Sequence, residues 1–210
     1  MAPEEVEAVV RRVMWLIKDS QTKVLVFSTW AEVLQLLEHA LKTNHVPCMR
    51  AKSRDALEGA IKEFRKPVQK GKLPLQTLLL LLKQGGNGLN LTEAQHVIMM
   101  EPIFDPAVEQ QAIGRIHRIG QTHDTTVHRF VVEKSVEQNV HRICSARVAA
   151  MDMRGASKAV ETPLTVRDVA LLLDESWGAH ARPANEEQSE AGPSSLHNHS
   201  EEGPSGLGTT

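Results

Sequence analysis

Cysteines, aromatic residues and long apolar runs are scarce in this chain of 210 residues. Its two cysteines, Cys48 and Cys144, lie far apart, which excludes a disulfide framework and any zinc module with about eight clustered Cys and His ligands. Aromatic residues make up 3% of the chain and tyrosine is absent, which disfavours stacking on single-stranded bases. No apolar stretch reaches the roughly 18–20 residues of a membrane span, and residues 1–5 lack a signal-peptide layout. We therefore expect a soluble intracellular protein in a reducing compartment.

The motifs that hold a nucleoside triphosphate are also missing. The sequence contains no G-x-x-x-x-G-K-[ST] loop, whose backbone amides cradle phosphates. It also contains no acidic D-E-x-H segment that would hold Mg²⁺. These absences exclude a complete ATPase site within this chain.

Charge is distributed unevenly along the chain. The net charge is −2, but residues 183–210 hold five glutamates and no Lys or Arg, so the preceding residues carry +3. A mildly basic body can meet a polyanion, although this excess alone does not establish nucleic-acid binding. The tail at 183–210 has hardly any apolar residues, so we predict that it is disordered. His197 and His199 within it are more simply solvated side chains than metal ligands.

Apolar residues in the remaining chain alternate between helical and strand patterns. Helical spacing predicts helices near 4–18, 31–43, 56–64 and 106–119, and a polar helix from about 135. Apolar and β-branched runs predict strands at 23–28, 46–51, 76–82, 96–101 and 126–132. The alternation favours one α/β domain whose parallel sheet is covered by helices on both faces. We expect a leading helix in 1–20, this domain in 21–150, a helical extension in 151–182 and the tail.

The run Gln-Ala-Ile-Gly-Arg-Ile-His-Arg-Ile-Gly-Gln at 111–121 is the most informative stretch. On a helix that continues to 119, Gln111, Arg115 and Arg118 lie on one face, because they are spaced by four and three residues. An apolar stripe that would hold the arginines against a sheet is formed by Ala112, Ile116 and Ile119. A fixed pair of guanidinium groups suits the phosphates of a nucleotide. The alternative is a solvated basic face.

Two further segments point to phosphate binding. Glycines at 85, 86 and 88 follow a predicted strand, where the backbone can approach a ligand and direct N–H groups at phosphate. A plain tight turn is the alternative. Ser28 and Thr29 follow the strand at 23–28, and side chains beyond the carboxyl end of a parallel strand face the ligand crevice. They could bond a DNA phosphate, cap the next helix, or do both.

Together, residues 23–30, 82–92 and 111–121 resemble motifs IV, V and VI of superfamily-two helicases, in the form typical of Swi/Snf-type DNA translocases. The motifs occur in the family's order over about residues 20–150. The resemblance implies the second RecA-like lobe of a two-lobe motor, whose N-terminal lobe holds ATP and Mg²⁺. It also implies a nuclear protein that acts on double-stranded DNA or chromatin.

The resemblance implies roles for individual residues. Arg115 and Arg118 would act as arginine fingers on a nucleotide held by the other lobe. Gln111 would help to orient this cluster, and Gly88 would line the same cleft. His117 would pack or hydrogen-bond at the lobe interface rather than serve as a general base. The implied contacts with the DNA backbone come from Ser28, Thr29, Lys83, Gln84, Gly85, Gly86 and Asn90. His123, His128 and Arg129 are predicted to form basic surface rather than a metal site.

Two departures and one further likeness refine the resemblance. Many members carry glutamine where Thr29 stands, and the usual Asp-Gly-Ser/Thr segment is replaced by Met-Arg-Ala-Lys-Ser-Arg-Asp-Ala at 49–56. Residues 163–173 are similar to the short helix that closes a branch of nuclear ubiquitin ligases and translocases of post-replication repair, with Thr165 and Asp168 spaced as a capping pair. Ubiquitin-pathway partners would be reached through a RING module outside this chain. The alternative function is a non-catalytic DNA-binding or protein-binding module.

Overall fold

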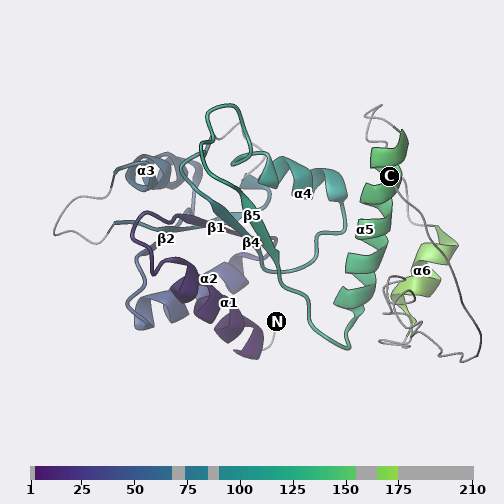
Figure 1. The fold of residues 1–210 in the computed structure, drawn as a ribbon. Helices are drawn as coiled ribbons and strands as arrows, with labels where there is room; N and C mark the ends of the chain where they lie inside the picture. Colours follow the sequence, from purple (N-terminus) through teal and green to yellow (C-terminus); the bar gives the residue numbers. More distant parts are fainter. Residues whose placement is uncertain (1–2, 68–73, 85–89, 155–164, 175–210) are drawn as a thin grey trace, which may run out of the picture. The chain divides into compact units, whose positions relative to one another are not determined.

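The computed structural model describes residues 3–67, 74–84, 90–154 and 165–174, which exclude the predicted tail (Figure 1). Every element predicted from the sequence is present. In chain order they are α1 (Pro3–Leu16), β1 (Val24–Ser28), α2 (Ala31–Thr43), β2 (Cys48–Arg50), α3 (Arg54–Phe64), β3 (Thr77–Leu81), β4 (His96–Met99), α4 (Pro106–Ile113), β5 (Thr126–Arg129), α5 (Val136–Arg154) and α6 (Val166–Leu172). None of the described helices combines the length and apolar character that crossing a membrane requires.

The five strands form one parallel sheet in the order β2-β3-β1-β4-β5. β1 lies at the centre, where Val24 is opposite Thr77 of β3 on one side and His96 of β4 on the other. Central parallel strands are apolar along their whole length because both of their faces are covered. The residues of β1 and almost all of those of β3 are accordingly buried. The prediction of an α/β domain with a parallel sheet is confirmed.

Helices cover both faces of the sheet (Figure 1). On β1, Leu25 and Phe27 belong to a core shared with α3 and α4, whereas Val24 and Val26 belong to a second core shared with α1 and α2. This alternation follows from the two-residue period of a strand. Two cores on one sheet account for the continuous apolar runs in the sequence.

Two buried polar side chains connect helices to the amino ends of the central strands. Lys23 Nζ donates to the carbonyls of Phe64 and Lys66 (3.0 Å for Lys66) at the end of α3. Burial lowers the pKa of Lys23, although the charge of Glu93 opposes this shift. The amide of Gln76 donates to three carbonyls of the segment between α1 and β1. Both side chains are satisfied, as buried polar groups in stable proteins are.

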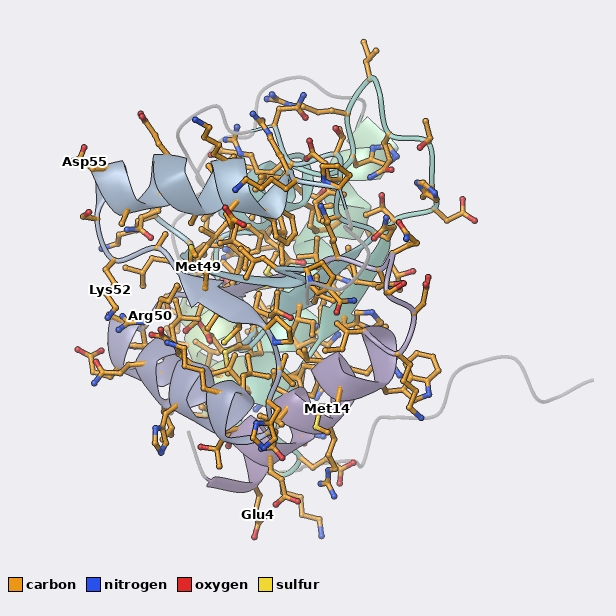
Figure 2. All side chains as sticks on the ribbon, turned by 90° about the vertical axis from the view of Figure 1, so that its left-hand side faces the viewer. Glu4, Met14, Met49, Arg50, Lys52 and Asp55 are labelled. Atoms are coloured by element: carbon orange, nitrogen blue, oxygen red, sulfur yellow. The ribbon has the colours of Figure 1, made fainter. Side chains whose placement is uncertain are left out.

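The edge strand β2 is fastened to α2 by charged groups. Arg50 Nε lies 2.7 Å from Glu38 Oε2, and Lys42 Nζ lies 2.7 Å from Glu38 Oε1. Burial raises the pKa of Glu38, but hydrogen bonds from both cations outweigh burial and hold the pKa below its usual value. Figure 2 shows Arg50 and Lys52 beside α2, on the segment that leads into α3. Arg50 of the divergent segment at 49–56 is thus engaged in an internal ion pair.

Polar contacts join α6 to α5. Arg147 Nη2 lies 3.1 Å from Asp168 Oδ2, and Asn139 Nδ2 donates to the carbonyl of Leu172 (3.3 Å). The predicted capping pair is confirmed, because Thr165 Oγ1 accepts from Asp168 N (3.1 Å) and Asp168 Oδ2 accepts from Thr165 N (2.9 Å). The closing helix is therefore defined by its own cap and attached by charge and hydrogen bonds.

A histidine pair connects β4, β5 and α1. Arg12 Nη2 donates to His128 Nδ1 (3.2 Å), and His128 Nε2 lies 3.2 Å from His96 Nδ1. Because guanidinium can only donate, His128 carries its proton on Nε2 and donates it to His96. Burial, followed by the charges of Arg12 and His96, lowers the pKa of His128 to about 4. Burial and Arg12 also lower the pKa of His96, so both rings are neutral at neutral pH.

We predict that the free energy of unfolding decreases as the pH falls from about 6.5 to about 4. His128 has a pKa of about 4 in the folded protein, whereas unfolded histidine titrates near 6.5, so the unfolded state binds more protons in this window. The contribution of the pair is complete above pH 6.5 and is lost as the pH approaches 4. One proton corresponds to a slope of about 1.4 kcal/mol per pH unit, measurable by urea denaturation at several pH values.

The double variant His96→Gln, His128→Gln lacks both titrating rings and should lose this part of the slope. His39→Gln, on the exposed face of α2, serves as the control and should keep the wild-type slope. Equal slopes in the double variant and the wild type would contradict the assignment.

Candidate functional site

The helix that leads into the arginine run is shorter than predicted. α4 begins at Pro106, and Asp105 Oδ1 caps it by accepting from Ala107 N (2.9 Å). The predicted continuation to residue 119 is wrong, because the helix ends at Ile113 with Gly114 as its C-cap and residues 114–120 form turns. Glycine disfavours helix continuation through its large conformational entropy.

Arg115 and Arg118 therefore lie on a turn rather than on a helical face with Gln111. Arg115 is buried (7% exposed), whereas Arg118 is exposed. Burial, followed by the positive charge of Arg118, lowers the pKa of Arg115. Gln111 is exposed in the last turn of α4. The structure thus brings the two arginines together but presents them differently.

The predicted apolar stripe holds for two of its three members. Ala112 and Ile116 are buried in the core shared with α3 and α4. Ile119 is fully exposed (103%), so its predicted burial is wrong. The physical reason is that the chain leaves the helix at Gly114, which removes Ile119 from the helical register. His117, next to Arg118, is also exposed.

Hydrogen bonds attach this turn to the segment before β4. Leu91 N donates to the carbonyl of Arg115 (2.9 Å), and Gln121 Nε2 donates to the carbonyl of Ala94 (2.9 Å). Because α4 starts after the carboxyl end of β4 and runs back, its C-terminal end reaches the residues that lead into the amino end of β4. The arginine turn is therefore fixed by the topology of the sheet.

A second group of predicted residues lies at the carboxyl ends of β1 and β3. The carbonyl of Ser28 accepts from Leu82 N (2.9 Å), which brings Ser28 and Thr29 next to Lys83 and Gln84. Ser28 is fully buried, and its Oγ accepts from the backbone N–H of Trp30 (3.0 Å). The predicted capping of α2 by Ser28 or Thr29 is wrong, because the N-cap of α2 is Trp30 and no side chain caps it; Ser28 instead stabilises the turn before the helix. Thr29 and Lys83 are exposed. Gln84 Oε1 accepts from the backbone N–H of Leu81, the last residue of β3 (3.3 Å).

Glu101 is a member of this group that sequence reasoning missed. Glu101 Oε1 accepts from both the backbone N–H of Thr29 and Thr29 Oγ1 (2.8 Å for Oγ1). The Glu101 side chain is only 9% exposed. A signal was available in the sequence, because Glu101 closely follows β4 and the carboxyl ends of neighbouring parallel strands meet at one edge. Glu101 fixes the turn that carries Thr29.

The remaining predicted residues surround the glycine loop. Gly85, Gly86 and Gly88 lie outside the described residues. Beyond the loop, the carbonyl of Asn90 accepts from Arg65 Nη2 (2.6 Å) at the end of α3. Asn90 thus lies beside the arginine turn, because the carbonyl of Arg115 accepts from the N–H of Leu91, the residue after Asn90. The predicted residues form two groups, connected by the segment between β3 and β4.

The predicted basic surface at 123–129 is present at His123 and Arg129, which are exposed, but not at His128, which is half-buried. His123 is exposed and bonds Thr122 (3.0 Å), but His128 is part of the histidine pair and Arg129 Nε pairs with Glu109 Oε1 (2.6 Å). The long-range contacts of these side chains explain the difference. Over the part of the chain that the structure describes, no group of three or more His, Cys, Asp and Glu is arranged to hold a metal ion.

We predict that Glu101→Ala lowers the free energy of unfolding by about 1–3 kcal/mol, because it leaves the partly buried N–H of Thr29 without its acceptor. Glu101→Gln is the matched control, since its amide oxygen can still accept from Thr29, and it should lose less. Urea denaturation measures both. Equal losses in the two variants would show that the carboxylate charge, and not the acceptor, stabilises this turn.

Comparison with known proteins identifies relatives. Residues 5–120, more than half of the chain, match the helicase conserved C-terminal domain family. The chain is 38% identical over 170 residues to the E3 ubiquitin-protein ligase SHPRH of Homo sapiens, covering 80% of this chain and 10% of that protein. It is 32% identical over 177 residues to the DNA repair protein RAD5 of Candida albicans, covering 81% of this chain and 16% of RAD5.

A solved structure agrees with these matches. The C-terminal part of the Fun30 ATPase domain has a TM-score of 0.62 and 25% identity, and the match covers 80% of this chain and 51% of that one. The parallel sheet with helices on both faces is thus a RecA-like C-terminal lobe. The chain spans about a tenth of the length of SHPRH. It belongs to the helicase conserved C-terminal domain family, among the Swi/Snf-type superfamily-two relatives SHPRH and RAD5.

Proposed function

We propose that this chain is the second lobe of an ATP-dependent double-stranded-DNA translocase of the SHPRH and RAD5 type. In this function it supplies arginine fingers and DNA-backbone contacts, while a separate N-terminal lobe holds ATP and Mg²⁺. The observation that carries the proposal is the pairing of buried Arg115 with exposed Arg118 on a hydrogen-bonded turn of a helicase C-terminal lobe.

Electrostatics supports an anionic ligand at the arginine turn. Burial and then the charge of Arg118 lower the pKa of Arg115, so the two like charges lie close enough to interact. A triphosphate would offset the like charges and accept the planar fork of Arg118. An arginine finger on a transferred phosphate is worth roughly 10³–10⁵ in rate. In this proposal Arg118 contacts the phosphate, Arg115 fixes the position of the turn, and Gln111 and Gly88 line the same cleft.

We assign the DNA backbone to the carboxyl edge of β1 and β3. Thr29 is exposed there, and its backbone N–H and its hydroxyl both donate to Glu101, so a contact with a phosphate would require one of these two donors to leave Glu101. Lys83 offers an exposed ammonium group on the neighbouring strand. Contacts of this kind position a protein on the backbone without reading sequence. The same proposed set includes Gln84, Gly85 and Gly86, and a separate contact is proposed for Asn90 beside the arginine turn, whereas the buried Ser28 supports the turn that carries Thr29.

The relatives suggest the wider setting. SHPRH is a ubiquitin ligase and RAD5 a DNA repair protein, which supports a nuclear role in DNA repair on duplex DNA or chromatin. Burial raises the pKa of both Cys48 and Cys144 to about 11, which leaves neither thiol suited to nucleophilic transfer. Ubiquitin transfer through a thioester on either thiol is therefore disfavoured, and two separated cysteines are too few for a zinc-bound RING module within these residues.

We expect Arg118→Ala to lower DNA-stimulated ATP hydrolysis by roughly 10³-fold or more in a protein that joins the N-terminal lobe of SHPRH to this chain. Because Arg118 is exposed, the variant should fold normally. The rate is measured at saturating ATP and DNA. Arg11→Ala is the charge-matched control, since Arg11 is an exposed residue of α1 that pairs only loosely with Glu7 (3.5 Å), and it should keep the wild-type rate.

Equal rates for Arg118→Ala and Arg11→Ala would contradict the proposed finger. A second candidate function is a non-catalytic DNA-binding module. It is favoured if the isolated chain then still binds duplex DNA in a salt-dependent way. The exposed Thr29 and Lys83 at one edge of the sheet are the observation behind that candidate.

Lys83→Ala tests the DNA contact separately. We expect it to weaken duplex binding severalfold and to reduce the slope of log affinity against log salt by about 0.9, because one phosphate contact is lost. Fluorescence anisotropy at several salt concentrations measures both. Lys18→Ala, an exposed lysine just after α1, is the control and should leave the slope unchanged. An unchanged slope in Lys83→Ala would remove Lys83 from the interface.

A further inference from the structure

Three serines of this chain follow an arginine at the third position before them: Ser53, Ser145 and Ser157. One class of serine kinases selects its targets by this pattern of charge. Ser157 lies outside the described residues. The other two serines share the arginine spacing but lie on different backbones, so the structure distinguishes them.

Ser53 has the accessibility and the backbone conformation that a kinase requires. It is exposed, and it lies in the irregular segment between β2 and α3 with an extended backbone (φ −142°, ψ 175°). Figure 2 shows Lys52 and Asp55, which flank this position, at the start of α3. Ser53 Oγ accepts from Ala56 N (3.2 Å), a contact that uses a lone pair of the oxygen and not its proton. An enzyme that binds extended segments can therefore reach the hydroxyl group.

Ser145 offers the same charge pattern in an unsuitable conformation. It lies inside α5 (Val136–Arg154), so an extended segment would form only if the middle of a long helix unwound. At Ser53 the equivalent cost is smaller, because Arg50 belongs to an edge strand of three residues and needs only to leave Glu38. Local opening of this kind occurs most easily at the edges of a fold.

We propose that Ser53 is a phosphorylation site for a kinase of this class. The kinase transfers the γ-phosphoryl group of ATP to Ser53 Oγ. The new O–P bond forms as the bond between the γ-phosphorus and ADP breaks, and the hydroxyl proton passes to a base of the kinase. The product is an anion beside the exposed ammonium group of Lys52, at the first turn of α3, where negative charge is favourable.

The position of Ser53 gives the modification a consequence, which rests on the proposed function. Arg50 pairs with Leu79 of β3, so the segment after β2 lies at the same edge of the sheet as Lys83. Phosphoserine carries about −1.5 to −2 charges near neutral pH. This charge offsets Lys52 and repels a DNA backbone that approaches Lys83. Phosphorylation of Ser53 therefore weakens binding to duplex DNA.

The site is tested on the full chain carrying Ser157→Ala, incubated with ATP and a calmodulin-dependent serine kinase, with the phosphate located by mass spectrometry. We expect the phosphate on Ser53 and its loss in Ser53→Asn. Asparagine keeps an N-cap acceptor for α3, so this variant should fold normally. Ser145→Ala is the matched control and should keep full incorporation. Phosphate on Ser145, or undiminished incorporation in Ser53→Asn, would overturn the site.

Anisotropy measurements with duplex DNA test the consequence. We expect the phosphorylated chain to bind about tenfold more weakly at low salt, and the difference to shrink as salt screens the added charge. Its thermal midpoint should not fall, which excludes unfolding as the cause. If phosphorylation leaves the affinity unchanged while Lys83→Ala lowers it, the regulation is overturned and the DNA contact stands. If neither change affects the affinity, the DNA contact fails as well, whereas the mapped phosphate still decides the site.

Discussion

Parallel pairing of β1 with both β3 and β4 is the constraint on which the rest of this lobe depends. Parallel strands bring ends of the same kind to the same edge, so Thr29, Lys83 and Glu101 meet although they are far apart in sequence. Each parallel neighbour also requires a crossover that returns over a face of the sheet. The crossover through α4 carries the chain back to the residues before β4, where the arginine turn is bonded to Leu91 and Ala94.

Most of the fold was accessible from the sequence because local patterns agree with the final packing. The period of apolar residues predicted α2 over 31–43, and the structure has Ala31–Thr43. The apolar run at 76–82 predicted β3, since a strand covered on both faces has no polar side to reveal. The cap at Thr165 was equally local, because both partners lie within one turn.

The candidate site was less accessible, since its geometry depends on contacts between distant segments. The spacing of Gln111, Arg115 and Arg118 fits a helix, but Gly114 ends α4 while Ile116 packs in the core. Tertiary packing here overrides a helical pattern. No local pattern could reveal the histidine pair, whose members are 32 residues apart. Glu101 could have been predicted more easily, because the order of parallel strands alone indicates which strand ends lie next to one another.

The different burial of Arg115 and Arg118 has an entropic consequence. A long side chain loses up to about 2 kcal/mol of rotamer freedom when it is immobilised. Arg115 has lost that freedom during folding, whereas Arg118 retains it at the surface. If a nucleotide binds as proposed, only one of the two arginines has then to be ordered at that moment. The entropic cost of ordering Arg115 has already been offset by the free energy of folding of the lobe.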